Sequence, residues 1–392
     1  MPISIVMNIT CPFCFETFRA TSVMYRCVNP HCSDRGEDRV LAEWRSLKKP
    51  PVMGKAFLPK EMSSLSHIIR FATPAKAVCP ICTDWTNVRI CPNCHFELRP
   101  DAGMVDDYII SVIGGREAGK GHYITTLVNR LQNELGKSFS FNLSIDDKET
   151  KDRYEEDYYG PLFRKKSLIQ PTHSAQTDAR VKTPMIFRLT IKKGILKRDV
   201  NLIFFDSAGE DMKSLNILSS EAKYICFSSG IIFLLDPLQI DQVRPTISPD
   251  QLPARDITTE PVYLLERLRE LFEQRFSLPA RVKVKTPVAF TISKTDTLYN
   301  ILPGNSVLKN NGLHPGYFNF ADGQKVQTEI ESFIHHFMGD GFLNRARAGF
   351  QTPRYFGISS LGCPPTNGRI QNINPIRVED PFLWILAQLN LM

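Results

Sequence analysis

The stretch VIGGREAGKGHY, residues 112–123, constrains most strongly what this 392-residue chain can fold into. It follows an apolar run and precedes apolar residues at helical spacing, so it lies where a strand leads into a helix. It nearly matches the phosphate-binding loop G-x-x-x-x-G-K-[ST], with Gly114, Gly119 and Lys120 in place. Gly121 stands where Ser or Thr is usual. The stretch therefore predicts a nucleotide site on an α/β sheet.

The chemistry expected of this loop follows from its residue types. Glycines let backbone N–H groups face phosphate oxygens, and the helix N-terminus adds its positive end. Lys120 is expected to reach the β- and γ-phosphates, and Arg116 is a candidate for offsetting charge there. The candidate nucleotide contacts in the loop are Gly114, Gly115, Arg116, Glu117, Ala118, Gly119, Lys120, Gly121 and His122.

Short apolar runs alternate with amphipathic helical patterns beyond the loop, which is typical of a mainly parallel sheet with helices on both faces. Strands are expected to begin at Tyr108, Pro184, Val200, Gly230, Pro287 and Arg354. Helices are expected after Lys120, ending at Gly136, and within 258–276, 326–337 and 379–389. These patterns predict one α/β domain over residues 104–392, with a helical insertion at about 240–285.

Three further motifs follow predicted strands in order. Asp206 and Gly209 in DSAGE suit a Mg²⁺ held through water and an amide that senses the γ-phosphate. Lys294 and Asp296 in SKTD suit a guanine base, because the carboxylate accepts from both the N1–H and the 2-amino group. Residues 359–361 offer a loop to contact the base. The candidates there are Ser359, Ser360 and Leu361. The carboxyl ends of such strands are where open α/β sheets bind ligands.

With these four motifs the sequence resembles the Ras-like P-loop GTPases of the TRAFAC class, and within it the bacterial double-GTPase group. Members of that group often carry N-terminal zinc ribbons ending in CPxCH, here residues 91–95, and a C-terminal segment similar to VEDPFLWIL, here residues 378–386. The resemblance implies GTP or GDP binding, Mg²⁺ dependence and a switching role. It also implies catalytic roles for Lys120, for Glu210, where the family usually has Gln, and for Thr172 as the switch threonine, with Thr177 and Thr183 as alternatives.

Three departures from the family pattern bear on activity. Gly121 removes one hydroxyl ligand of Mg²⁺, which water can replace. Glu210 adds negative charge near the attacking water, and Ser293 replaces the usual Asn or Thr of the base motif. We therefore expect weaker metal binding and slow hydrolysis. A minor alternative makes His122 a metal ligand.

Eight cysteines precede residue 95, mostly as Cys-x-x-Cys, which predicts zinc sites rather than disulfides. We expect two Zn²⁺ ions, held by Cys11, Cys14, Cys27 and Cys32 in one quartet and by Cys79, Cys82, Cys91 and Cys94 in the other. His31 could replace Cys32, and interleaved pairing is a lesser alternative. The corresponding modules are residues 1–40 and 76–103, joined by a linker with a short helix, 41–75.

Composition limits the remaining functions only loosely. A net charge of +7 permits phosphate contact without indicating nucleic acid. Without a signal-peptide pattern or an apolar run of roughly 20 residues, we expect a cytoplasmic protein with no membrane span. The sequence predicts a slow Mg²⁺-dependent GTPase acting as a regulatory switch, with zinc ribbons or switch regions contacting a protein partner. The alternatives are an inactive GTP-binding scaffold or sensor, and a zinc-ribbon nucleic-acid-binding protein regulated by its nucleotide domain.

Overall fold

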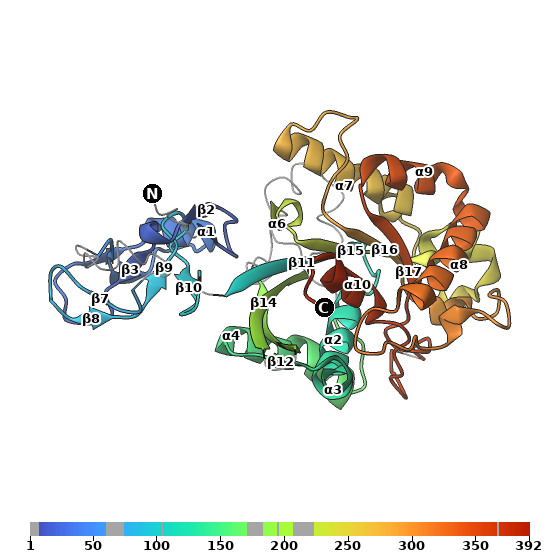
Figure 1. Cartoon of the computed structure of the whole chain (residues 1–392), viewed down its shortest axis with the longest axis horizontal. Helices are drawn as coiled ribbons and strands as arrows, with labels where there is room; N and C mark the ends of the chain where they lie inside the picture. Colours follow the sequence, from blue (N-terminus) through green and yellow to red (C-terminus); the bar gives the residue numbers. More distant parts are fainter. Residues whose placement is uncertain are drawn as a thin grey trace. The chain divides into compact units, whose positions relative to one another are not determined.

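The structure is a computed structural model that describes residues 8–59, 74–103, 105–170, 183–193, 196–206, 223–366 and 368–392. Thr172, Gly209 and Glu210, three candidate site residues, lie outside these ranges. The chain divides into two compact units, Met1–Asp107 and Tyr108–Met392 (Figure 1).

The described residues of the first unit form very short strands, one short α-helix and a 3₁₀ turn at Ala20–Ser22. Its elements are β1 (Asn8–Thr10), β2 (Thr17–Arg19), β3 (Met24–Arg26), β4 (Arg35–Glu37), α1 (Arg39–Trp44), β5 (Val52–Gly54), β6 (Ala56–Phe57), β7 (Ala77–Val78), β8 (Trp85–Thr86), β9 (Arg89–Ile90) and β10 (Glu97–Leu98). Its small core contains a stacked pair, Phe13 and Phe96, with ring centroids 4.3 Å apart, and the fully buried Tyr25. Cysteine side chains make up much of the rest of this core.

One sheet joins the two cysteine-bearing segments of this unit. Its strand order is β10-β9-β3-β6, and β3 pairs antiparallel with β9 in the register Met24↔Ile90. The segments expected as successive modules, 1–40 and 76–103, therefore share a sheet. Each of the two strands leads directly into a cysteine, Cys27 after β3 and Cys91 after β9.

The second unit is built on a seven-stranded sheet of order β12-β13-β14-β11-β15-β16-β17. The strands are β11 (Asp106–Gly114), β12 (Phe141–Ser144), β13 (Met185–Lys193), β14 (Leu196–Asp206), β15 (Gly230–Leu235), β16 (Val288–Ile292) and β17 (Pro353–Gly357). The strands β11, β15, β16 and β17 are parallel to their neighbours in this group, whereas β12, β13 and β14 pair antiparallel. Every residue of β15 and β16 is buried, as their continuous apolar runs predict.

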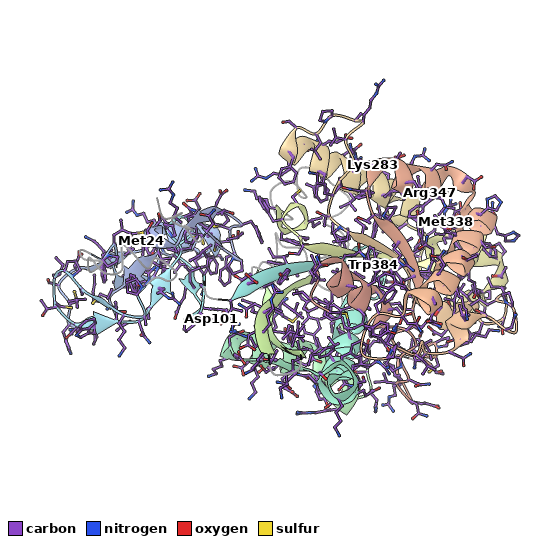
Figure 2. The ribbon with its side chains drawn as sticks, in the orientation of Figure 1. Met24, Asp101, Lys283, Met338, Arg347 and Trp384 are labelled. Atoms are coloured by element: carbon purple, nitrogen blue, oxygen red, sulfur yellow. The ribbon has the colours of Figure 1, made fainter. Side chains whose placement is uncertain are left out.

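Helices pack on both sides of this sheet (Figure 1). They are α2 (Lys120–Arg130), α3 (Gly136–Phe139), α4 (Lys148–Arg153), α6 (Lys223–Cys226), α7 (Pro261–Phe276), α8 (Phe320–Met338), α9 (Asp340–Gly349) and α10 (Asp380–Gln388), with π-helical segments Leu131–Leu135 and Tyr154–Arg164. The C-terminal helix α10 contacts β15 and β16, and its buried Trp384 lies 5.8 Å from the Phe356 ring (Figure 2). The predicted α/β fold with helices on both faces is confirmed.

The structure also differs from the sequence expectations in detail. The edge strand β12 and the helix α9 were not anticipated. The helix after Lys120 does not end at Gly136, which has helical φ and ψ; a left-handed residue, Ser140 at φ 54°, ends it instead. The segment 240–285 contains short 3₁₀ turns followed by α7, and it connects the parallel neighbours β15 and β16. Within the described residues, no helix is both long and apolar enough to cross a membrane.

Candidate functional site

The phosphate-binding loop has the backbone that its sequence predicts. It connects the end of β11 at Gly114 to the start of α2 at Lys120, and Gly119 adopts the left-handed region at φ +90°. The loop also approaches the neighbouring strand closely, because a Cβ on Gly114 would lie 2.6 Å from the Leu234 carbonyl oxygen. Both glycines are therefore required by conformation or by space.

Lys120 points back across this loop rather than into solvent. Its Nζ donates to the carbonyl oxygens of Gly114 at 3.0 Å and Gly115 at 2.9 Å, and the residue is only 7% exposed. A buried ammonium held by neutral carbonyls has favourable interactions still to gain from an anion. The arrangement places a cation at the helix N-terminus, where a phosphate would bind.

The base motif is held by the next strand along the sheet. The carboxylate Oδ1 of Asp296 accepts a hydrogen bond from the Ser359 hydroxyl at 2.5 Å. The Ser359 hydroxyl oxygen in turn accepts a hydrogen bond from the Gly362 N–H at 2.7 Å. Burial raises the pKa of the Asp296 carboxyl above its ordinary value, although the Ser359 bond opposes this. A ligand that donates two hydrogen bonds, as guanine can, would stabilise this partly buried anion. Ser360 and Leu361, the other two base-loop candidates, are partly exposed beside Ser359.

Lys294 has a partner that sequence reasoning missed. Its Nζ lies 2.8 Å from Oδ2 of Asp236, a residue with a side chain that is 3% exposed. Asp236 comes directly after the last residue of β15. The same carboxylate accepts the N–H of Leu238 through Oδ1. The available signal was an aspartate directly after a run of apolar residues, as at Asp206. Ser293 is buried and donates to the Leu235 carbonyl, so it stabilises the strand end.

The remaining loop candidates divide into exposed and buried side chains. Arg116 and Glu117 are about half exposed and lie 3.8 Å apart, whereas Ala118 is fully buried. Gly121 lies in the first turn of α2. The ring of His122 accepts a hydrogen bond at Nε2 from the backbone of Ile169 at 3.2 Å, so this nitrogen is already engaged. No other metal-ligating side chain groups with His122 among the residues that the structure describes.

The structure brings the loop and the base motif to one edge of the sheet, because β11, β15, β16 and β17 run parallel and end there. Asp206 closes β14, beside β11 in the same sheet. The contacts of Thr172, Gly209 and Glu210 lie outside the described residues, so their roles stay predictions.

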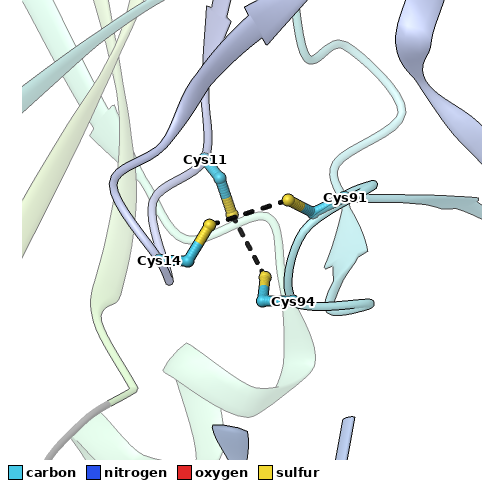
Figure 3. A group of neighbouring side chains, drawn as sticks. All are labelled: Cys11, Cys14, Cys91 and Cys94. Atoms are coloured by element: carbon cyan, nitrogen blue, oxygen red, sulfur yellow. Dashed lines mark hydrogen bonds between the residues drawn. The ribbon is translucent and has the colours of Figure 1, made fainter. Parts of the chain in front are cut away.

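The cysteines of the first unit converge in two groups that could each hold a metal ion. One contains Cys11, Cys14, Cys91 and Cys94, and the other Cys27, Cys32, Cys79 and Cys82. Figure 3 shows the first group, in which the sulfur atoms of Cys11 and Cys94 lie 3.6 Å apart and those of Cys14 and Cys91 lie 3.7 Å apart. Zinc bound tetrahedrally at ~2.3 Å separates its sulfurs by about 3.8 Å, so the donor set fits zinc.

Backbone geometry supports the same interpretation at each Cys-x-x-Cys turn. The residue after the second cysteine adopts a left-handed conformation, at φ 62° for Phe15, 61° for Thr83 and 58° for His95. Its N–H donates to the carbonyl of the first cysteine of the turn at 3.0 to 3.1 Å. Backbone N–H groups in these turns also point at sulfur atoms, as from Phe13 to Cys11 at 3.4 Å. Amides directed at sulfur stabilise thiolates, which are the metal-binding form.

The expected quartets were wrong, and the interleaved alternative is the one observed. Because β3 and β9 are antiparallel, Cys27 and Cys91 leave the sheet at opposite ends. Cys91 therefore meets the turn at Cys11, and Cys27 meets the turn at Cys79. Cys32 belongs to the second group with its sulfur 4.0 Å from that of Cys79, whereas His31 is exposed and outside it.

A buried carboxylate ties one turn to the only α-helix described in the first unit. Asp38 caps α1 by accepting the Leu41 N–H, and it lies 2.9 Å from Nδ1 of His95 and 2.5 Å from the Arg26 guanidinium. Burial acts to raise the pKa of Asp38, but these hydrogen bonds hold it below its ordinary value. The sequence showed no pattern that singled out Asp38.

The strand order, the phosphate-binding loop and the aspartate-bearing base motif together define a P-loop protein of the GTP-binding class. Comparison with known proteins agrees with this class: residues 108–353 match the model of the family Double-GTPase 2. The chain belongs to this family, and the predicted resemblance is confirmed.

The individual proteins that the chain resembles share low sequence identity with it. The chain is 27% identical over 320 residues to the "Putative ESX-1 scaffolding and assembly protein SaeC" of Mycolicibacterium smegmatis, covering 76% of this chain and 80% of that protein. Among solved structures it is similar to the Arl6 BBS3 small GTPase of Trypanosoma brucei, at 13% identity and a TM-score of 0.27, over 73% of this chain and 98% of that one. It is also similar to the bacterial selenocysteine-specific elongation factor EF-Sec, at 12% identity and a TM-score of 0.29. This match covers 74% of this chain and 29% of that factor.

Proposed function

We propose that this chain binds GTP and GDP in preference to ATP and hydrolyses GTP slowly with Mg²⁺, as a regulatory switch. The observation that carries the proposal is the partly buried Asp296 carboxylate, held by Ser359 and lying at the same edge of the sheet as Lys120. Adenine lacks the pair of donors that this acceptor would bind.

Slow rather than fast hydrolysis is supported by the residues around the expected metal. Gly121 leaves one Mg²⁺ position to water, and Glu210 places a negative charge where the family usually has Gln. Lys120 would neutralise the developing phosphate charge, Asp206 would hold Mg²⁺ through water, and Thr172 is proposed as the switch residue. Positioning and metal binding, on which this chemistry depends, are both weakened.

The proposed output is a contact with a protein partner, made by the cysteine-rich unit with its two zinc ions or by the switch segments. The relative named as a scaffolding and assembly protein supports a partner-binding role here. The same relative, with Gly121, favours a second candidate, a GTP-binding scaffold without turnover. Phosphate release from bound GTP separates the two candidates.

The test is nucleotide titration of the whole chain, with and without Mg²⁺, followed by phosphate release. We expect GDP and GTP to bind and ATP to bind at least 10-fold more weakly, because two charge-assisted hydrogen bonds are lost. Lys120→Ala should reduce GTP affinity by about 100-fold or more. Lys137→Ala, which removes an exposed lysine from α3, is the matched control and should bind GTP normally. Equal affinities for ATP and GTP, or normal GTP binding by Lys120→Ala, would refute the proposal.

A further inference from the structure

A short segment without regular structure, residues 166–170, crosses the second unit and is tied down at both ends. We call it the strap. At its start, the Lys166 carbonyl accepts the Ile370 N–H at 3.0 Å, and Ser167 forms an antiparallel bridge with Arg369. Near its end, the Ile169 N–H donates to the ring of His122 at 3.2 Å. The strap therefore connects the segment around residues 369–370 to the first turn of α2.

The histidine contact at the end of the strap requires one protonation state. A backbone N–H can only donate, so Nε2 of His122 must be the unprotonated nitrogen of a neutral ring. Burial, and then the positive charge of Lys294, lowers the pKa of His122 to about 4, which keeps the ring neutral at ordinary pH. The bond is thus available whenever the protein is near neutrality.

The contact between His122 and the strap lies beside the candidate nucleotide site. The residue lies two positions after Lys120, whose ammonium is held by the phosphate-binding loop. The positive charge of Lys294 in the base motif contributes to the lowered pKa of His122. A nucleotide that reaches from Lys120 to the base motif would have its ribose between these two groups, and His122 lies in the same first turn of α2 as Lys120. The strap ends on the same side chain.

We propose that His122 is a positioning residue that fastens the strap beside the ribose of the bound nucleotide and slows nucleotide dissociation. This inference rests on the proposed function. It assigns His122 to retention of the nucleotide rather than to metal binding. Affinity within one site is tuned mainly through dissociation, so the rate of release is the sensitive quantity.

The experiment measures release of a fluorescent GDP analogue from the full chain, chased with excess GDP, together with hydrogen exchange at the Ile169 amide. His122→Leu, which fills space without an acceptor, should release GDP about 3- to 10-fold faster and lose Ile169 protection, as expected for one lost hydrogen bond. His122→Gln, whose amide oxygen can accept, should remain within about 2-fold of the unmodified chain. Ile169→Pro removes the donor instead and should add nothing to His122→Leu, because both break the same bond.

The outcomes separate this inference from the proposed function. If the unmodified chain binds no GDP, the proposed function fails and the retention role fails with it. If GDP binds but His122→Leu releases it at the unmodified rate, only the inference is overturned. The same holds if Ile169 protection is unchanged in His122→Leu, or if His122→Gln behaves like His122→Leu. Should His122→Leu fail to fold, Ile169→Pro alone tests the contact, with faster release supporting it and an unchanged rate refuting it.

Discussion

At the scale of single residues, the base motif is stabilised by a partner on a neighbouring strand end. Asp236 is almost fully buried and pairs with Lys294, while Ser359 holds Asp296. The two charged side chains of the motif are thus each fixed before any ligand is present, which lowers the ordering entropy that binding must overcome.

Removing the Asp236 charge tests this arrangement. Asp236→Asn should lower the free energy of unfolding by about 1 to 2 kcal/mol and guanine nucleotide affinity by about 3- to 10-fold, because the Lys294 ammonium loses a partly buried partner. Asp241→Asn is the matched control, since Asp241 pairs with Arg255 at an exposed position and should change stability by less than about 0.5 kcal/mol. Equal effects of the two substitutions in denaturant titration would contradict the interpretation.

The missing metal-ligand hydroxyl leads to a second prediction at this scale. Gly121→Ser should raise Mg²⁺ affinity in the presence of GTP, because a hydroxyl replaces one water. If metal limits turnover, phosphate release should rise as well. If Glu210 limits it, only the double variant Gly121→Ser with Glu210→Gln should accelerate release. Mg²⁺ titrations that show no difference between Gly121→Ser and the unmodified chain would mean that the metal obtains its ligands by another route.

His122 makes stability depend on pH in a definite direction. Its folded-state pKa of about 4 lies below the ordinary 6.5, so the stabilisation present above pH 6.5 is lost as the pH falls toward 4. By pH 5 the loss should be about 2 kcal/mol. The difference in the free energy of unfolding between pH 7.5 and pH 5 should therefore be smaller in His122→Gln than in the unmodified chain, because the Gln side chain does not titrate. His336→Gln changes an exposed histidine and should not alter the difference.

At the scale of elements, the antiparallel pair β3 and β9 decides which cysteines meet. Local spacing could not show this, since Cys79 and Cys82 are closer in sequence to Cys91 than to Cys27. Pairing of strands more than 60 residues apart depends on the whole unit, as the Thr86 side chain donating to the Arg26 carbonyl illustrates.

Double cysteine substitutions distinguish the two pairings by zinc content. Cys14→Ser with Cys91→Ser removes two ligands from one group and should leave about one zinc per chain. Cys14→Ser with Cys27→Ser removes a ligand from each group and should leave about none. Successive pairing requires the reverse result, so metal analysis of the two purified proteins decides. Cys363→Ser, outside both groups, is the control and should retain about two zinc ions.

The phosphate-binding loop and six of the seven strands of the large sheet were predictable because their signals are local. A glycine-bearing turn between an apolar run and an amphipathic helix contains its own geometry, and the left-handed Gly119 follows from it. Asp236, Asp38 and the strap contact of His122 depend on residues distant in sequence, with Ile169 lying 47 positions from His122. Side-chain pairing of this kind leaves no periodic trace in one sequence.

At the scale of the whole molecule, two units of different construction are joined in one chain. The second unit is stabilised by a continuous apolar core around its sheet, whereas the small core of the first unit combines cysteine side chains with aliphatic residues and a few aromatic rings. Small domains of this kind usually need metals for independent stability. The family match, residues 108–353, lies within the second unit and includes none of the first.

The interleaving of the two cysteine groups has a consequence for how the chain is made. Residues 1–40 contain half of each group, so a ribosome that has released only this segment has completed neither. The group that includes Cys27 can close only after Cys82 has emerged, and the group that includes Cys11 only after Cys94. Both closures therefore fall within a short interval at the end of the unit, and the thiols made first must wait, reduced and unliganded, for those made last.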